Sequence, residues 1–428
     1  MNVKEFERIV TLGLGRAVVY LRDHDARPYR GIILDACLHN KAHDAQVEGS
    51  RAEYMLELMR ESGDRAYYSD AVIASLGEDA GDWDDLQRFR IARFLAQEGS
   101  QSARDAMHAA FQTKRISTSD IASEFIELDG IPGLLFVVGE IGEQLARDSD
   151  QWEDDFLLSG AGDICGTEKV ESALKNAAKT DKRIRAYLNA VEENRVLRAR
   201  DKSSDPKGLT YSDVQPLIGA EDSILWRWGQ TASDSDLKLA ASAFIEEADQ
   251  KRMLTYLRLF AKRKYPLDLT PLFGLVALPD GPVPRHALRV LANLHDERIR
   301  RLAFDLVETR SPLRAYAVDL LVRNFRDGDQ ATVEAWCYAE QDPNTVNAFD
   351  RSLRNFFAAH PDSATEVRLL RMLYEREPCA HCRCFIVERL LQSNGLTDTQ
   401  RSECEHDSYL ETRYLVSPQA GQAGMPDR

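Results

Sequence analysis

Paired runs of apolar residues at helical spacing constrain the fold of this 428-residue chain more than any other feature. In residues 51–76, apolar side chains recur every three or four positions, in two runs separated by Gly63 and Asp64. The arrangement returns in residues 83–111 and, most regularly, in residues 286–325. Two amphipathic helices joined by a polar turn form an αα-hairpin, and hairpins in series bury their apolar faces against their neighbours. The sequence therefore predicts an all-α fold, an α-solenoid of antiparallel helix pairs.

Local signals place individual helices within this pattern. Residues 182–200 predict one long, highly charged helix. Asp296 is expected to cap a helix that begins at the next residue, and Ser311-Pro312 is expected to open another. Ser408 is expected to cap the last helix, which would close the C-terminal end of the array.

The length of the chain predicts more than one compact part, because single hydrophobic cores stop growing at about 250–300 residues. Residues 201–210 are polar and contain Pro and Gly, which is typical of a linker. We expect one helical-repeat lobe in residues 1–200 and a HEAT-like lobe in residues 211–416. Residues 417–428 are rich in Gly, Pro and Gln and are expected to be disordered.

The charge balance bears on partners and location. A formal net charge of −15 repels nucleic-acid phosphates and anionic membranes, so neither is an expected partner. No apolar run reaches the roughly 18 residues of a transmembrane helix, and the mixed amphipathic start lacks the apolar core of a signal peptide. Seven cysteines in such a chain indicate reduced thiols and a cytoplasmic protein.

Several segments carry a family resemblance. Residues 295–325 and the cysteine-rich C-terminal region are similar to HEAT-like repeat proteins of bacteria. The chain most closely resembles an uncharacterised group of these proteins. The segments that carry this resemblance are residues 14–25, 36–40, 48–54, 378–383 and 403–413. The resemblance implies a superhelix of the HEAT or armadillo type that acts as a scaffold or recognises a partner on its concave surface.

Enzymes among the HEAT-like proteins have features that this chain lacks. The deoxyhypusine hydroxylase type carries paired His-Glu dipeptides as iron ligands, whereas His295 and His406 are each followed by Asp. The HEAT-like DNA glycosylases present a basic concave face, which disagrees with the net charge of −15. The chain also has no phosphate-binding Gly-Lys-Ser/Thr loop and no Gly-x-Ser-x-Gly nucleophile elbow.

Residues 23–54 contain the densest group of polar side chains with acid–base or ligand chemistry. The candidate ligand-binding residues are His24, Asp25, His39, His43, Glu48, Arg51 and Tyr54. If they converge in one pocket, the chain is an enzyme or a small-ligand or metal-binding protein. The alternative is a structural network that ties an irregular loop to the next helix through hydrogen bonds to the backbone, and we favour that alternative.

A second group of polar side chains lies near the C-terminus. Cys379, Cys382, Cys404 and His406 offer four ligands for tetrahedral zinc, with a Cys-x-x-Cys spacing in the first pair. In the competing interpretation, which we prefer, the thiols pack as small apolar groups between the last helices. No cofactor other than this zinc is expected.

Two further features concern partner binding. Trp226 and Trp228 form the densest aromatic spot and are candidate anchors for a protein partner, although burial in a core explains them equally well. A basic run in residues 252–264 fits either a phosphate-binding strip or the solvated face of an amphipathic helix. The sequence as a whole favours a non-enzymatic scaffold that binds a protein partner.

Overall fold

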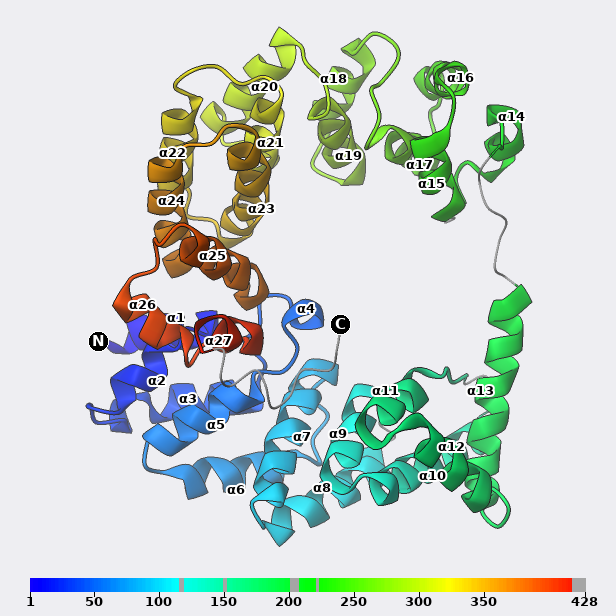
Figure 1. Ribbon diagram of the computed structural model, residues 1–428, viewed down its shortest axis with the longest axis vertical. Coiled ribbons are helices and arrows are strands. Elements are labelled where there is room, and N and C mark those ends of the chain that lie inside the picture. Colours follow the sequence, from blue (N-terminus) through cyan, green and yellow to red (C-terminus); the bar gives the residue numbers. More distant parts are fainter. Residues whose placement is uncertain (115–118, 149–151, 201–207, 221–222, 418–428) are drawn as a thin grey trace. The chain divides into compact units, whose positions relative to one another are not determined.

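The computed structural model describes residues 1–114, 119–148, 152–200, 208–220 and 223–417. All regular secondary structure in these ranges is helical (Figure 1), which confirms the predicted all-α class. Residues 201–207 of the predicted linker at 201–210, and all but the first residue of the predicted tail at 417–428, lie outside the described residues. None of the described helices combines the length and apolar character needed to cross a membrane.

The chain divides into two compact units. Unit 1 comprises Met1–Lys202, Pro378–Leu391 and Leu396–Arg428, and unit 2 comprises Ser203–Glu377 and Gln392–Gly395. The segment from residue 378 to residue 416 was predicted to belong to the C-terminal lobe of residues 211–416. Most of it instead belongs to the same unit as the N-terminal residues.

Unit 1 is built from two sets of helices that are far apart in the sequence. The N-terminal set comprises α1 (Val3–Leu12), α2 (Arg16–Leu21), the 3-10 helix η1 (Arg27–Tyr29), α3 (Arg30–Leu38), α4 (Ala45–Glu48), α5 (Ala52–Glu61), α6 (Arg65–Ser75), α7 (Asp82–Gln97), α8 (Gln101–Lys114), α9 (Ser119–Asp129), α10 (Ile131–Arg147), α11 (Phe156–Cys165), α12 (Thr167–Ala177) and α13 (Lys182–Arg200). The C-terminal set comprises α25 (Ala380–Gln392), α26 (Asp398–Cys404) and α27 (Leu410–Val416).

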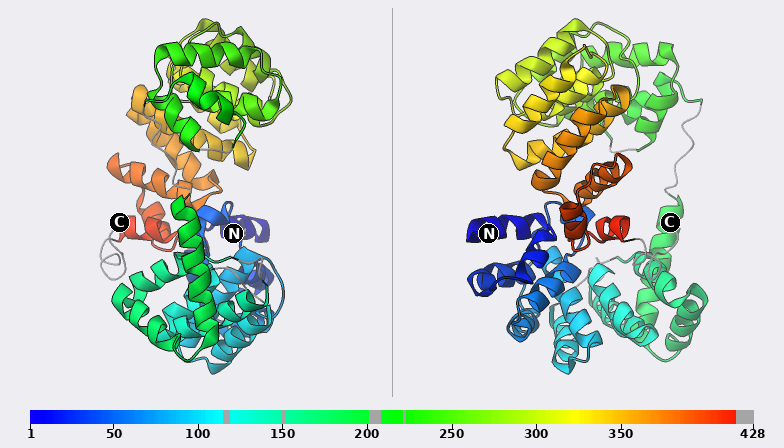
Figure 2. Two further views of the ribbon diagram at one scale, coloured as in Figure 1. Left: turned by 90° about the vertical axis from the view of Figure 1, so that its right-hand side faces the viewer. Right: turned by 60° about the vertical axis from the view of Figure 1, so that its left-hand side comes forward.

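Packing in unit 1 brings the two sets together. Along the N-terminal set, α5 and α6 pack on α7, α7 on α9, and α10 on both α9 and α13. The C-terminal helix α26 packs against α2, so helices from early and late in the described chain lie side by side in one unit, as the red and blue ribbons of Figures 1 and 2 show. The bounds of α13 match the long helix predicted for residues 182–200.

Unit 2 contains the remaining helices. They are α14 (Tyr211–Val214), η2 (Gln215–Leu217), α15 (Ser223–Thr231), α16 (Asp234–Ile245), α17 (Gln250–Phe260), α18 (Thr270–Val276), α19 (Pro282–Leu291), α20 (Glu297–Glu308), η3 (Arg314–Tyr316), α21 (Ala317–Val322), α22 (Asp329–Ala339), α23 (Pro343–Ala359) and α24 (Ser363–Arg376). Alternate helices form one row, α15–α17–α19–α21–α23, in which each member packs on the next (Figure 1). Helices α16, α18, α20 and α24 each pack against a member of this odd-numbered row.

Aspartate caps define several helix starts in unit 2. The side chain of Asp296 accepts a hydrogen bond from the backbone N–H of Arg298, which confirms the predicted cap of α20. Asp249, Asp342 and Asp362 cap α17, α23 and α24 in the same way. Each cap pairs a donor that the first helical turn would otherwise leave unsatisfied.

Two other predicted helix starts are wrong. At Ser311-Pro312 the chain makes a turn in which the serine hydroxyl accepts from the N–H of Leu313, and α21 begins only at Ala317 after a 3-10 turn. Ser408 does not cap α27, because its backbone N–H donates to the carbonyl of Gly13 and its hydroxyl is buried without a partner among the described residues. Contacts with distant parts of the chain override the local signal at Ser408.

Candidate functional site

Three of the seven N-terminal candidate residues are buried in unit 1. Glu48 and Arg51 form an ion pair of 2.6 Å in which both side chains are almost fully buried. Arg51 also donates to the carbonyl of Thr11 at 2.6 Å, and the hydroxyl of Tyr54 donates to the carbonyl of Leu14 at 2.9 Å. These bonds hold the turn after α1, so the three side chains have structural partners.

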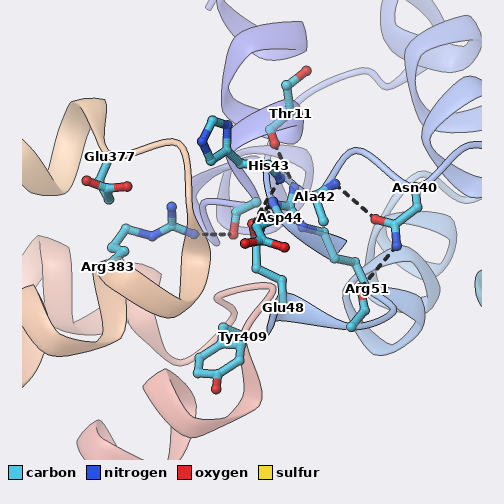
Figure 3. Close-up of polar contacts among 12 residues, drawn as sticks. Thr11, Asn40, Ala42, His43, Asp44, Glu48, Arg51, Glu377, Arg383 and Tyr409 are labelled. Carbon is cyan, nitrogen blue, oxygen red and sulfur yellow. Dashed lines mark hydrogen bonds and ion pairs between the residues drawn. The ribbon is translucent and has the colours of Figure 1, made fainter. Parts of the chain in front are cut away.

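Glu48 organises the loop that precedes it. Its Oε1 accepts from the backbone N–H groups of His43 and Asp44 at 2.9 and 3.1 Å (Figure 3). Burial alone would raise the pKa of Glu48, but the charge of Arg51 and these hydrogen bonds lower the pKa overall. A hydrogen bond from the backbone of Ala380 adds to this effect and links the loop to the start of α25.

The other four candidates are dispersed on the surface. The imidazole of His24 stacks on the ring of Tyr20, and Asp25 pairs with the exposed Arg27. His39 contacts Asp35 at 2.8 Å, while His43 is exposed and meets Glu48 only through its backbone. The seven residues therefore do not converge in one pocket, as a catalytic or ligand site built from them would require.

A buried arginine and aspartate lie at the junction of the two helix sets of unit 1. Arg383 of α25 binds Asp407 through two hydrogen bonds of 2.9 and 3.2 Å, and neither side chain is exposed. The carbonyl of Gly13 accepts from Nη2 of Arg383 and from the backbone N–H of Ser408. Residues of the first turn and of the C-terminal helices thus share one hydrogen-bond network.

The same junction contains a second polar group. Glu57 of α5 accepts from His406 and from Arg413, and Nε2 of His406 contacts Arg22 at 2.8 Å. Burial tends to raise the pKa of Glu57, but its hydrogen bond with His406 and the charge of Arg413 lower the pKa below its ordinary value.

The four proposed zinc ligands are not assembled into a metal site. Cys379 hydrogen-bonds Cys382, a contact that together with burial raises the pKa of the Cys379 thiol. Cys404 is buried in α26, and both ring nitrogens of His406 are engaged by Arg22 and Glu57. Across the described ranges, no group of three or more His, Cys, Asp or Glu side chains has an arrangement suited to a metal ion.

The two candidate tryptophans have different environments in unit 2. Trp228 is fully buried, and its indole N–H donates to the carbonyl of Leu209 at 2.9 Å. Trp226 is 42% exposed, and the ammonium of Lys262 lies 5.1 Å from the centroid of its ring. Of the two, only Trp226 is accessible to a partner.

Lys262 also lines a hollow where helices of the odd-numbered row end. This lysine hollow has a volume of about 900 Å³ and is lined by residues at the C-terminal ends of α17, α19, α21 and α23. Its basic lining residues are Lys262, Arg263, Lys264, His295 and Arg323. The residues lining it include no aspartate or glutamate.

A second hollow, of about 870 Å³, is lined by residues of α19, α21 and α23 and of the segment between α20 and α21. We call it the arginine hollow, because its lining includes Arg285, Arg289, Arg310, Arg314 and Arg351. Arg285 pairs with Asp280 and Arg314 with Glu340. The other three form no ion pair with any described residue, although Arg289 contacts His286 at 3.5 Å.

The carboxylates of the arginine hollow are already engaged. Asp342 caps α23, and Asp319 accepts from the hydroxyl of Ser352 at 2.8 Å. Burial raises the pKa of Asp319, while Arg351 and Arg289 act in the opposite direction, which places both guanidinium groups near this carboxyl. Neither Arg289 nor Arg351 stands out in the sequence, because each is one charged residue on an otherwise ordinary amphipathic helix.

Comparisons with known proteins add little. No protein-family model matches this sequence, and no curated protein matches it. A solved structure that matches is the crystal structure of an engineered protein from the Northeast Structural Genomics Consortium, 14% identical, covering 99% of this chain and 100% of that one. The TM-score of 0.19 is too low for that structure to inform fold or function.

Proposed function

We propose that this chain is a non-enzymatic scaffold of the α-solenoid type, similar to HEAT and armadillo proteins, that binds a protein partner. The stacking of alternate helices in unit 2 supports this architecture, because each helix pair buries its apolar face against the next. The partner surface would be the odd-numbered row, the counterpart of the concave face in such proteins. The seven cysteines, all of them free thiols, are consistent with a cytoplasmic location.

The observation that carries the proposal is the arginine hollow. Arg289 and Arg351 belong to α19 and α23 and lie near Asp319 of α21, and neither forms an ion pair with any described residue. Guanidinium groups bind carboxylates through paired hydrogen bonds, and arginine is enriched at the centres of protein interfaces. An acidic segment of a protein partner would supply the carboxylates that these arginines lack.

The alternative function, an enzyme or ligand-binding protein using the N-terminal residues, has less support. Glu48, Arg51 and Tyr54 are committed to the turn after α1, and the histidines lie apart on the surface. Nucleic acid is also disfavoured as the partner, given the net charge of −15.

Charge reversal tests the proposal. The wild-type protein and the Arg289→Glu, Arg351→Glu double variant would be used to capture proteins from the cells that produce this chain, with quantitative mass spectrometry. We expect at least one protein to be retained by the wild type and lost with the double variant. Arg301→Glu is the matched control, since Arg301 is an exposed arginine of α20 outside the hollow. A partner set that is identical for all three proteins contradicts the proposal.

A further inference from the structure

We infer that the lysine hollow is a second binding site, for an acidic peptide segment that carries one bulky apolar side chain. It uses none of the residues of the arginine hollow, so it stands on separate observations. Charge, apolar lining and an exposed aromatic ring each support this ligand chemistry.

The charge of the hollow is uniformly positive. Lys262, Lys264 and Arg323 are exposed and form no ion pair with any described residue. Arg263 is held in place, because its guanidinium donates to the carbonyl of Gln230 and pairs with Asp234. In a chain with a net charge of −15, three uncompensated cations in one hollow produce a local field that attracts acidic ligands.

Apolar side chains lie between these cations. Leu267, Leu269, Leu294 and Val322 line the same hollow. A lining that combines cations with aliphatic groups fits a ligand with both negative charge and an apolar body, and it fits a bare phosphate less well. A peptide with glutamates on both sides of a phenylalanine or leucine has this composition.

Aromatic side chains also border the hollow. Tyr265 lines it and is only 2% exposed, and its hydroxyl is fully enclosed by the protein, so this hydroxyl is not counted among the ligand contacts. Beside the hollow, the exposed ring of Trp226 packs against Lys262, which offers an aromatic anchor of the kind that dominates interface energetics.

The helix ends suggest a different role, which the experiment must separate from binding. Helices α17, α19, α21 and α23 end at this hollow, and cations near helix C-termini offset the partial negative charge there. If that is their whole role, replacing Lys264 or Arg323 lowers stability and leaves peptide affinity unchanged.

The test is a fluorescence-anisotropy titration of the full chain with a labelled peptide, Glu-Glu-Phe-Glu-Glu. Its controls are Gln-Gln-Phe-Gln-Gln, Glu-Glu-Ala-Glu-Glu and a labelled single-stranded oligonucleotide. We expect saturable, salt-sensitive binding of the first peptide, with affinity at least about tenfold lower for each control. The affinity for the first peptide should fall by a similar factor in the double variant Lys264→Glu, Arg323→Glu and in the single variant Trp226→Ala. The circular dichroism of both variants should match that of the wild type.

Matched variants complete the test. Arg301→Glu and Trp152→Ala remove an exposed arginine and an exposed tryptophan elsewhere and should leave affinity unchanged. Arg289→Glu with Arg351→Glu should also bind the peptide normally, which separates this inference from the proposed function. The inference is overturned if the wild type does not bind the first peptide, or if the Lys264→Glu, Arg323→Glu variant binds it as tightly as the wild type does. It is also overturned if the wild type binds the oligonucleotide more tightly than the peptide.

Discussion

Arg16 and Glu403 are 387 positions apart in the sequence, yet their side chains form two hydrogen bonds of 2.7 and 3.0 Å in unit 1. The Glu403 side chain is 5% exposed, so the pair is shielded from solvent on one side. With the bonds that Gly13 accepts from Arg383 and Ser408, this pair joins both ends of the chain. The folding of unit 1 should therefore depend on residues at the C-terminal end of the sequence.

Gly13 allows the close approach of these segments. Its φ of +72° is left-handed, and a Cβ atom there would lie 2.0 Å from Oγ of Ser408. We expect Gly13→Ala to lower the free energy of unfolding by about 2–4 kcal/mol, from backbone strain plus steric overlap. Gly328 is the matched control, since its backbone is also left-handed, with φ +93° and ψ −7°, but a Cβ atom there would have no atom of the described residues within 4 Å.

Gly328→Ala should lower the free energy of unfolding only through backbone strain, by about 1 kcal/mol. Urea unfolding followed by circular dichroism measures both variants. Equal destabilisation by the two substitutions would show that the contact with Ser408 contributes nothing.

The buried pair Arg383–Asp407 predicts a non-additive double-mutant cycle. Arg383→Met leaves Asp407 as a buried carboxylate without its main partner, which should cost about 3–5 kcal/mol of unfolding free energy. Combining it with Asp407→Leu removes the orphaned charge and should recover much of that loss. Chemical unfolding of all four proteins gives the coupling energy.

Arg27→Met serves as the control for that cycle. Arg27 pairs with Asp25 on the surface, where solvent screens the interaction, so this substitution should leave stability unchanged. Additive effects of the Arg383 and Asp407 substitutions would refute the coupling.

The lowered pKa of Glu57 predicts acid sensitivity. A carboxyl whose pKa is lower in the folded than in the unfolded state stabilises the fold at pH values above its ordinary pKa of about 4.3. That stabilisation disappears as the pH falls through the folded-state pKa. Glu48 behaves in the same way, so we expect unit 1 to lose stability between about pH 5 and pH 3.

Glu57→Gln tests the assignment. The variant should be less stable than the wild type at pH 7, because Arg413 loses its charged partner, and its decline in acid should be shallower. Thermal unfolding over this pH range measures both effects. Parallel pH profiles for the two proteins would exclude Glu57 as a source of the acid sensitivity.

The contacts made by His406 predict that a metal chelator does not destabilise the protein. Because His406 is engaged by Glu57 and Arg22, we expect EDTA to leave the thermal unfolding temperature unchanged and elemental analysis to find no stoichiometric zinc. A clear drop in that temperature with EDTA, reversed by added zinc, would restore the metal hypothesis for Cys379 and Cys382.

Local features of the fold were predictable from the sequence, and long-range ones were not. The bounds of α13 and the cap at Asp296 depend on neighbouring residues, so periodicity and capping rules identified them. The role of Ser408 was mispredicted, because its decisive contact is with Gly13 at the other end of the chain.

The candidate sites follow the same division. Lys262 and Lys264 belong to the basic run of residues 252–264, and Trp226 was one of the two candidate tryptophans, so the sequence indicated part of the lysine hollow and its neighbour. Arg289 and Arg351 come together with Asp319 only through the packing of α19, α21 and α23. The chemistry of Arg51 and Tyr54 made them candidates, but their backbone partners Thr11, in the last turn of α1, and Leu14, just after it, are about 40 positions away in the sequence.

The central claim is that the odd-numbered row of unit 2 binds an acidic segment of a partner protein. Site-specific photocrosslinking tests this claim most directly. The crosslinker p-benzoylphenylalanine would replace Tyr316 or Asn344, which line the arginine hollow beside its arginines, or, as control, Arg301, in the cells that produce the chain. We predict that positions 316 and 344 crosslink to one acidic segment of the same protein, identified by mass spectrometry, and that position 301 does not. Absence of a protein adduct at both positions, or the same adducts at all three, would contradict the account.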